Sequence, residues 1–96
     1  MIIQFVRLKS SLDETALLHK AREREEQFKS LPGLVQKYYV KLSNDGEYGG
    51  IYLWDSIESL NRYRQTDLAK SIPEAYQVSE APDIEVMKLL FKLREG

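Results

Sequence analysis

The sequence predicts an α+β fold of the ferredoxin-like split βαβ type, in which helices cover one face of a four-stranded antiparallel sheet. Three observations support this prediction. Strand and helix patterns follow one another in the order βαββαβ, an Asp-Gly turn connects the second and third strand patterns, and both helix patterns begin with residues typical of helix N-termini. With 96 residues, the chain can form one domain, 1–96, and a second domain would lack a core.

The first strand and the first helix follow from the residue pattern. Residues 2–8 are β-branched and aromatic, which is typical of a strand. Ser11 and Glu14 have the spacing of a capping box, so we expect a helix to begin there, and apolar residues at helical spacing extend it to about Lys29. Pro32-Gly33 ends this helix, because proline cannot continue the helical hydrogen bonds.

Residues 34–42 and 48–54 form the predicted central hairpin. The turn between them, 43–46, reads Ser-Asn-Asp-Gly and supplies the positive φ angles that a tight hairpin needs. After the hairpin, Asp55 or Ser56 can cap a second helix.

The last third of the chain holds a short helical turn and the final strand. We expect Thr66 to cap a turn at residues 67–71, which Pro73 ends. Residues 76–82 are irregular or form a short edge strand. Residues 84–93, with the sequence IEVMKLLFKL, are the predicted last strand.

Apolar side chains on both faces of the predicted sheet indicate a dimer. In the strand 48–54, Ile51 and Leu53 point to one face, while the tyrosines and Trp54 point to the other. A sheet with helices on one face would normally present polar side chains on its second face. We therefore expect a homodimer through the sheet face. The alternative is that residues 76–82 fold across this face.

Composition excludes several classes of function. Fourteen Lys and Arg residues balance fifteen Asp and Glu residues without a basic cluster, so we expect no nucleic-acid partner. Cysteine is absent, which excludes disulfides, thiolate nucleophiles and cysteine-ligated metal clusters. No apolar stretch reaches membrane-spanning length, and the apolar run at the start is too short for a signal peptide. We expect no membrane association and a cytoplasmic protein.

Three segments carry a resemblance to known proteins: Pro32-Gly33-Leu34, Gly49-Gly50-Ile51-Tyr52-Leu53-Trp54-Asp55 and Ser59-Leu60-Asn61-Arg62-Tyr63. They resemble the antibiotic-biosynthesis-monooxygenase superfamily, and within it the YdhR-type monooxygenase family. The resemblance spans nearly the whole chain and implies a dimeric α+β barrel. It indicates the fold more strongly than the chemistry, because the superfamily contains cofactor-free oxygenases, haem-degrading enzymes, isomerases and proteins with no established activity.

No cofactor is expected from these motifs. The haem-degrading members of the superfamily rely on an Asn on the first strand and on a Trp and a His around the second helix. Here the first strand has no Asn, and the single histidine, His19, lies in the predicted first helix, nearly opposite its apolar face. A lone histidine also disfavours a transition-metal site, and no motif requires flavin.

Glu25 is the candidate catalytic base. It lies on the same predicted helical face as Leu18, Ala21 and Phe28, so its carboxylate could lie over the core, where desolvation raises a pKa toward the range of a general base. The alternative is that Glu25 lies at the edge of this face and pairs with a nearby Arg or Lys.

Four aromatic residues are the candidate substrate-binding residues: Tyr38, Tyr52, Trp54 and Tyr63. Such rings suit a flat aromatic substrate, and the hydroxyls could orient an oxyanion. The alternative is that they pack in the core or in the dimer interface. Asn61 and Arg64 could stabilise an enolate or phenolate, although helical spacing favours an exposed position for both.

Two hypotheses of function follow. The first is a cofactor-independent monooxygenase that acts on an aromatic or polycyclic phenol, whose carbanion or phenolate would reduce dioxygen directly in a pocket between the sheet and the helices. The second is a non-catalytic dimer that binds a small hydrophobic ligand or serves in a stress response. An isomerase or a lactone-processing enzyme on the same fold is a third possibility, and it would need the same base.

Overall fold

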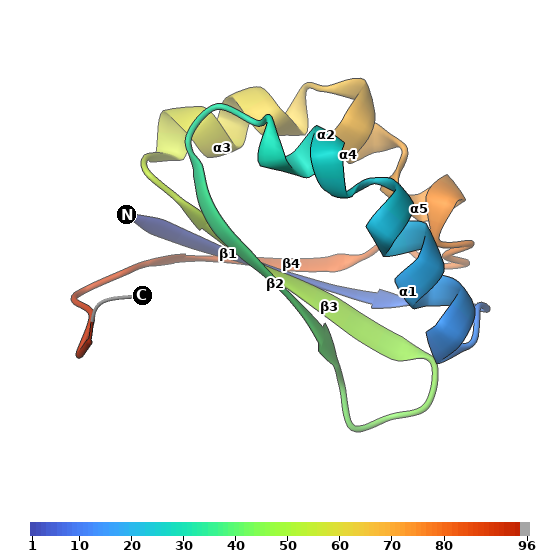
Figure 1. The fold of residues 1–96 in the computed structure, drawn as a ribbon. Coiled ribbons are helices and arrows are strands. Elements are labelled where there is room, and N and C mark those ends of the chain that lie inside the picture. Colours follow the sequence, from blue (N-terminus) through green and yellow to red (C-terminus); the bar gives the residue numbers. More distant parts are fainter. Residues whose placement is uncertain (95–96) are drawn as a thin grey trace.

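The computed structural model describes residues 1–94, and the four strands in this part of the chain form an antiparallel sheet in the order β2-β3-β1-β4. The strands are β1 (Ile2–Lys9), β2 (Leu34–Lys41), β3 (Glu47–Trp54) and β4 (Asp83–Lys88). Figure 1 shows the helices on one side of this sheet and none on the other. The predicted ferredoxin-like α+β fold is confirmed.

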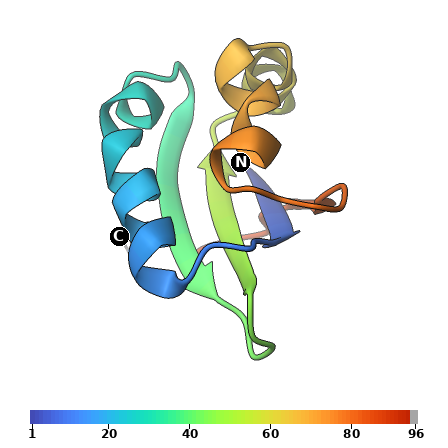
Figure 2. The same cartoon turned by 90° about the vertical axis from the view of Figure 1, so that its right-hand side faces the viewer.

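The helices form two groups above the sheet. Their bounds are α1 (Glu14–Glu23), α2 (Glu25–Lys29), α3 (Ile57–Arg64), α4 (Asp67–Lys70) and α5 (Ile72–Ala75). Figure 2 shows α1 and α2 standing apart from α3, α4 and α5 across the sheet. Within residues 1–94, no helix is long and apolar enough to cross a membrane.

The predicted single helix to Lys29 is interrupted at Arg24, which has φ −97° and ψ 0°. The guanidinium of Arg24 turns toward the other helix group and donates to the Leu68 carbonyl at 3.1 Å and to Ser71 Oγ at 2.9 Å. These contacts with α4 anchor the break between α1 and α2. As a consequence, the helical period does not continue from α1 into α2.

The helix caps differ in part from the expected ones. The α1 cap is Asp13, whose carboxylate accepts from the Ala16 amide, and Ser11 bonds Gln77 instead of capping a helix. The predicted caps Ser56 and Thr66 are confirmed at α3 and α4.

Strand β2 contains a bulge that shifts its side-chain alternation by one residue. Leu34 pairs with Trp54 and Gln36 pairs with Leu53, so Val35 is the extra residue. Beyond the bulge, Lys37 lies opposite Tyr52 and therefore faces the helices. Because side chains alternate along a strand, Tyr39 and Lys41 share the face of Lys37. The intervening Tyr38 and Val40 face the other way.

The C-terminal third departs from the expected pattern in two places. Pro73 does not end a helix but lies in the first turn of α5, where a missing amide hydrogen costs nothing. The last strand, β4, ends at Lys88 and not at residue 93. In the irregular segment 76–82, Val78 forms an isolated bridge to Ser10, and Tyr76 is buried beneath the helices.

The core lies between the sheet and the helices and is rich in aromatic rings. Trp54 and Leu60 are fully buried, and the Trp54 indole Nε1–H donates to Gln4 Oε1 at 3.0 Å. The Tyr52 and Trp54 rings are stacked at 6.1 Å, and the Tyr63 ring lies 5.1 Å from that of Trp54. These packed rings fix β3 against α3.

The other face of the sheet carries apolar side chains that no helix covers. Ile51 and Leu53 lie on it, as the alternation of β3 predicts. Tyr38 on β2 and Met87 on β4 are 48% and 40% exposed there. We call this surface the open face, and residues 76–82 leave these side chains uncovered.

Candidate functional site

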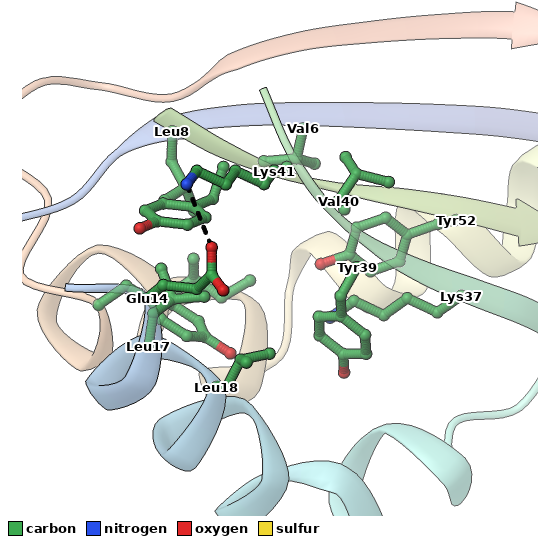
Figure 3. A pocket seen from close by; sticks show the side chains of 15 residues that line it. Val6, Leu8, Glu14, Leu17, Leu18, Lys37, Tyr39, Val40, Lys41 and Tyr52 are labelled. Atoms are coloured by element: carbon green, nitrogen blue, oxygen red, sulfur yellow. Dashed lines mark ion pairs between the residues drawn. The ribbon is translucent and has the colours of Figure 1, made fainter. Parts of the chain in front are cut away.

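A mostly apolar pocket of about 250 Å³ lies between the sheet and the two helix groups. Its floor is formed by strands, with Val6 from β1 and Gly50 from β3. Leu17 on α1 and Ile72 on α5 form opposite walls. Figure 3 shows side chains from β1, β2, β3 and α1 converging on this space. A small, largely apolar organic molecule is the kind of ligand that such a cavity suits.

Gly50 keeps the floor of this pocket open. A Cβ atom at this position would lie 3.0 Å from Tyr52 Cε1 and 3.4 Å from Lys37 Cε. On the open face, a Cβ at Gly49 would lie 2.8 Å from Phe5 Cε1. Both glycines thus allow neighbouring side chains to approach the backbone of β3 closely.

Lys37 extends from β2 into the aromatic wall of the pocket. Its Nζ lies 3.4 Å from the centroid of the Phe28 ring, 4.4 Å from that of Tyr39 and 4.5 Å from that of Tyr52. In Figure 3 the side chain runs between the rings of Tyr39 and Tyr52. Among the ion pairs of residues 1–94, none includes Lys37.

The environment of Lys37 disfavours its charged form. Burial, with a smaller contribution from the positive charge of Arg24, lowers the pKa of Lys37 from 10.5 to about 7. The ring faces act in the opposite direction, because cations are attracted to aromatic π-systems. Near neutral pH, a large fraction of Lys37 therefore carries a free amine.

Lys41 provides a contrast on the same face of β2. Its Nζ lies 3.2 Å from Glu14 Oε1, and both side chains are more than half exposed. The hydrogen bond and the charge of Glu14 raise the pKa of Lys41. This ion pair links β2 to α1 beside the pocket, where Figure 3 draws it as a dashed line. Two lysines on one strand face thus have opposite electrostatic environments.

Four tyrosines line the pocket: Tyr39, Tyr48, Tyr52 and Tyr76. Burial is the main cause that raises the pKa of the Tyr39, Tyr52 and Tyr76 phenols above the ordinary value. These phenols therefore stay protonated at neutral pH and can donate hydrogen bonds. The Tyr52 hydroxyl also lies 3.4 Å from the hydroxyl of Tyr63, and either oxygen can be the donor.

The structure brings three of the four predicted substrate-binding residues together, but only Tyr52 lines this pocket. Tyr63 lies behind it and lines a second apolar cavity of about 250 Å³ on the other side of Ile72. Trp54 is fully buried, and Tyr38 is on the open face. A substrate-binding role for the four residues stays a prediction, for which the geometry favours Tyr52.

Glu25 lies in an ion-pair cluster and not over the core. Its carboxylate accepts from Arg22 at 2.8 Å and from Lys29 at 3.2 Å. Hydrogen bonds from these two cations lower the pKa of Glu25, so the expected rise in pKa is wrong and the alternative pairing is confirmed. The break at Arg24 explains the difference, since Glu25 begins a new helix. Its catalytic role is not tested by this geometry and stays a prediction.

The remaining polar candidates are at the surface. His19 is largely exposed, with Nε2 3.0 Å from Glu23, and Asn61 and Arg64 are exposed on α3. In the described part of the chain, no group of three or more His, Asp or Glu side chains could hold a metal ion.

Lys37 is the residue that sequence reasoning missed. A signal was available in the alternation of Lys37, Tyr39 and Lys41, but regular alternation from Leu34 would have placed Lys37 on the open face. The bulge at Val35 reverses that assignment.

The fold and the pocket define a class: ferredoxin-like α+β domains with a small-molecule cavity between sheet and helices. Several solved structures share this fold. One is a protein of unknown function from Nitrosomonas europaea. It is 21% identical in sequence, the match covers 99% of this chain and 95% of that chain, and the TM-score is 0.77. Another is SnoaB, a cofactor-independent oxygenase from Streptomyces nogalater. It is 16% identical in sequence, the match covers 98% of each chain, and the TM-score is 0.74. A third, from Deinococcus radiodurans, bears the description "putative antibiotic biosynthesis monooxygenase". It is 16% identical in sequence, the match covers 100% of this chain and 99% of that chain, and the TM-score is 0.74.

The chain belongs to the family described as "Putative mono-oxygenase ydhR", which matches residues 3–89. Among curated proteins, none matches this sequence. The identities to the solved structures are low, so these structures support the fold, while the family supports a general monooxygenase-like role.

Proposed function

We propose that this protein is a cofactor-independent monooxygenase that acts on an aromatic or polycyclic phenol bound in the pocket over Gly50. The observation that carries the proposal is an apolar cavity whose polar groups are mainly phenol hydroxyls and a partly buried lysine, Lys37. An apolar cavity of this kind suits a flat organic molecule, and such a molecule would displace water from it on binding.

The reaction proposed is the conversion of a ring CH₂ group to a ketone. The substrate loses a proton to become a resonance-stabilised anion, and this anion transfers electrons to dioxygen. One oxygen atom then forms the C=O bond, and the second leaves as water with the two hydrogens removed from carbon. Protonated Tyr39 and Tyr76 can donate hydrogen bonds to an anionic substrate oxygen, which stabilises the anion more than the neutral phenol.

Oxygen consumption by the purified, metal-stripped and flavin-free protein tests this function with anthrone as the substrate, whose ring CH₂ group should become the second ketone of anthraquinone. Saturable uptake above the uncatalysed rate is the expected result. Tyr39→Phe should lower the rate, and Tyr38→Phe is the matched control, because these neighbours face opposite sides of β2. No uptake with any substrate in a wider anthrone and hydroquinone panel would favour the alternative, a non-catalytic ligand-binding dimer.

The predicted catalytic role of Glu25 has a direct test in Glu25→Gln. Its carboxylate is held by Arg22 and Lys29 at the surface, so it is a weak proton acceptor near neutral pH. If Glu25 is the base, the variant loses turnover. Unchanged turnover would remove Glu25 from the mechanism.

A homodimer through the open face is part of the same proposal. Its support is the uncovered apolar surface, which includes Phe5, Ile51, Leu53 and Met87. Soluble proteins seldom leave a contiguous apolar sheet face in water, and two-fold pairing of identical faces is the common way to cover one. Pairing through this face would leave both pockets accessible, since they lie on the opposite side of each sheet.

A further inference from the structure

We propose that Lys37 is the proton acceptor that ionises an acidic phenol or enol in the pocket, and that the ammonium so formed holds the resulting anion. This inference deepens the proposed function and rests on it for the identity of the substrate class. It assigns to Lys37 a catalytic role, because its Nζ would contact the acidic group directly.

The position of Lys37 is the first argument. Its Nζ lies within 4.5 Å of the centroids of the Phe28, Tyr39 and Tyr52 rings, so the surroundings of the amine are aromatic faces and the cavity. A bound flat phenol would lie against the same rings. The amine is thus close to the space that the acidic group of a ligand must occupy.

The charges around Lys37 are the second argument. Arg24, at the junction of α1 and α2, is the cation that acts on it. Tyr39 from β2 and Tyr52 from β3 face it with their rings and are neutral phenols at neutral pH. Tyr76, after α5, lies farther along the pocket wall, and Tyr63 on α3 lies behind the pocket; both are also neutral phenols.

Carboxylates do not compete for this role within the pocket. Among its lining residues the acidic side chain is Glu14, which Lys41 already engages at 3.2 Å. Burial and Arg24 lower the pKa of Lys37 to about 7, which supplies a free amine at neutral pH. Lys37 is therefore the lining residue best suited to accept a proton.

The step is a simple proton transfer. The O–H bond of the phenol or enol breaks, its electron pair stays on oxygen, and a new N–H bond forms at Lys37 Nζ. Before the transfer both partners are neutral, and after it they form a cation–anion pair. Such a pair is strong in a site of low dielectric, and Arg24 adds a second positive charge that favours the anion.

Competitive acetylation with trace acetic anhydride across pH, read by mass spectrometry, measures the titration of each lysine in the unmodified protein. A lysine side chain reacts with this reagent only in its unprotonated form. We expect Lys37 to titrate with a midpoint near 7 and Lys41, the matched control on the same strand face, to titrate above its ordinary value. A Lys37 midpoint close to that of Lys41, or no labelling of Lys37 at any pH, overturns the proposal.

A second experiment follows the proton with 4-nitrophenol, whose anion absorbs visible light and whose neutral form does not. On binding to the wild-type protein near neutral pH, where a large fraction of Lys37 is a free amine, the probe should show a stronger phenolate band than it shows free in the same buffer. Lys37→Met should abolish this increase, and Lys88→Met, at an exposed position of β4 outside the pocket lining, should leave it unchanged. No increase in the wild type, or the same increase in Lys37→Met, overturns the proposal.

Lys37→Arg separates proton transfer from charge. Arginine is permanently protonated, so this variant should still bind the preformed phenolate but should not accept a proton. With an oxidisable substrate, the pH–rate profile of Lys37→Arg should follow the ionisation of the free substrate, while the wild type keeps an acid limb near 7. Identical profiles count against Lys37 as the base.

The two proposals can fail separately. A protein that shows the Lys37 titration and the phenolate band but consumes no oxygen is an anion-stabilising binder or isomerase, and the monooxygenase proposal fails alone. A protein that consumes oxygen while Lys37 titrates near its ordinary value uses another base, and the Lys37 proposal fails alone.

Discussion

The stability of this protein should depend on pH through Lys37. In the unfolded chain Lys37 has its ordinary pKa of 10.5, whereas in the folded protein it lies at about 7. Between these values the unfolded state binds more protons than the native state, so the free energy of unfolding rises with pH. Relative to acidic pH, the fold therefore gains stability at Lys37 as the pH rises. This gain is complete above the pKa of the unfolded chain and is lost as the pH falls through the pKa of the folded protein.

The magnitude follows from the two pKa values. A difference of one in pKa corresponds to about 1.4 kcal/mol, so the whole window amounts to about 5 kcal/mol. From about pH 7.5 to about pH 9.5 the contribution of Lys37 alone is about 2.5 kcal/mol. Tyr39 and Tyr52 stay protonated up to that limit, because burial raises the pKa of both phenols.

Urea denaturation at fixed protein concentration measures this effect, with the fluorescence of Trp54 as the signal. Trp54 is the single tryptophan and is fully buried. Lys37→Met should be more stable than the wild type near neutral pH, and the difference should shrink by about 2.5 kcal/mol toward about pH 9.5. Lys41→Met serves as the control and should follow the wild-type slope. Parallel curves for Lys37→Met and the wild type would refute the reasoning.

Three further predictions concern packing, turns and assembly. Gln4→Leu should cost ~1–3 kcal/mol in urea denaturation, because it leaves the buried Trp54 indole N–H without an acceptor; a neutral result would contradict that hydrogen bond. Both Gly33 and Gly46 have a positive φ, so replacing either with alanine should destabilise the fold, by ~1 kcal/mol for Gly46→Ala. Gly33→Ala should cost more, because its Cβ would also lie 2.7 Å from the Asp55 carboxylate. Equal losses would argue against the steric explanation. Ile51→Glu should convert the proposed dimer to a monomer in sedimentation velocity, whereas a glutamate on the solvent side of α1 should not; an unchanged dimer would place the interface elsewhere.

The strands and the hairpin were predictable because their signals are local. The hairpin at residues 43–46 and the alternation of β3 depend on residues that are neighbours in sequence. Both are confirmed, although in the Asp-Gly pair Gly46 has a positive φ and Asp45 does not. The alternation of β2 was not predictable, since the bulge at Val35 depends on how β2 pairs with β3. Regular alternation from Leu34 would turn Tyr38 toward the helices, and the bulge turns Lys37 there instead.

The prediction that Glu25 lies over the core failed for a similar reason, since the course of its helix depends on distant residues. Helical periodicity joins Glu25 to the apolar face of Leu18 and Ala21 only if the helix is continuous. The break at Arg24 depends on hydrogen bonds to Leu68 and Ser71, more than forty residues away. A tertiary contact of that kind leaves no periodic trace in the sequence around Glu25.

The bulge in β2 also bears on aggregation. Strand β2 is at the edge of the sheet, so its outer backbone groups are available to another chain. An extra residue near the start of an edge strand bends it and increases its twist, which makes it a poor template for a further strand. The same residue that directs Lys37 into the pocket thus helps to protect the β2 edge against uncontrolled strand addition.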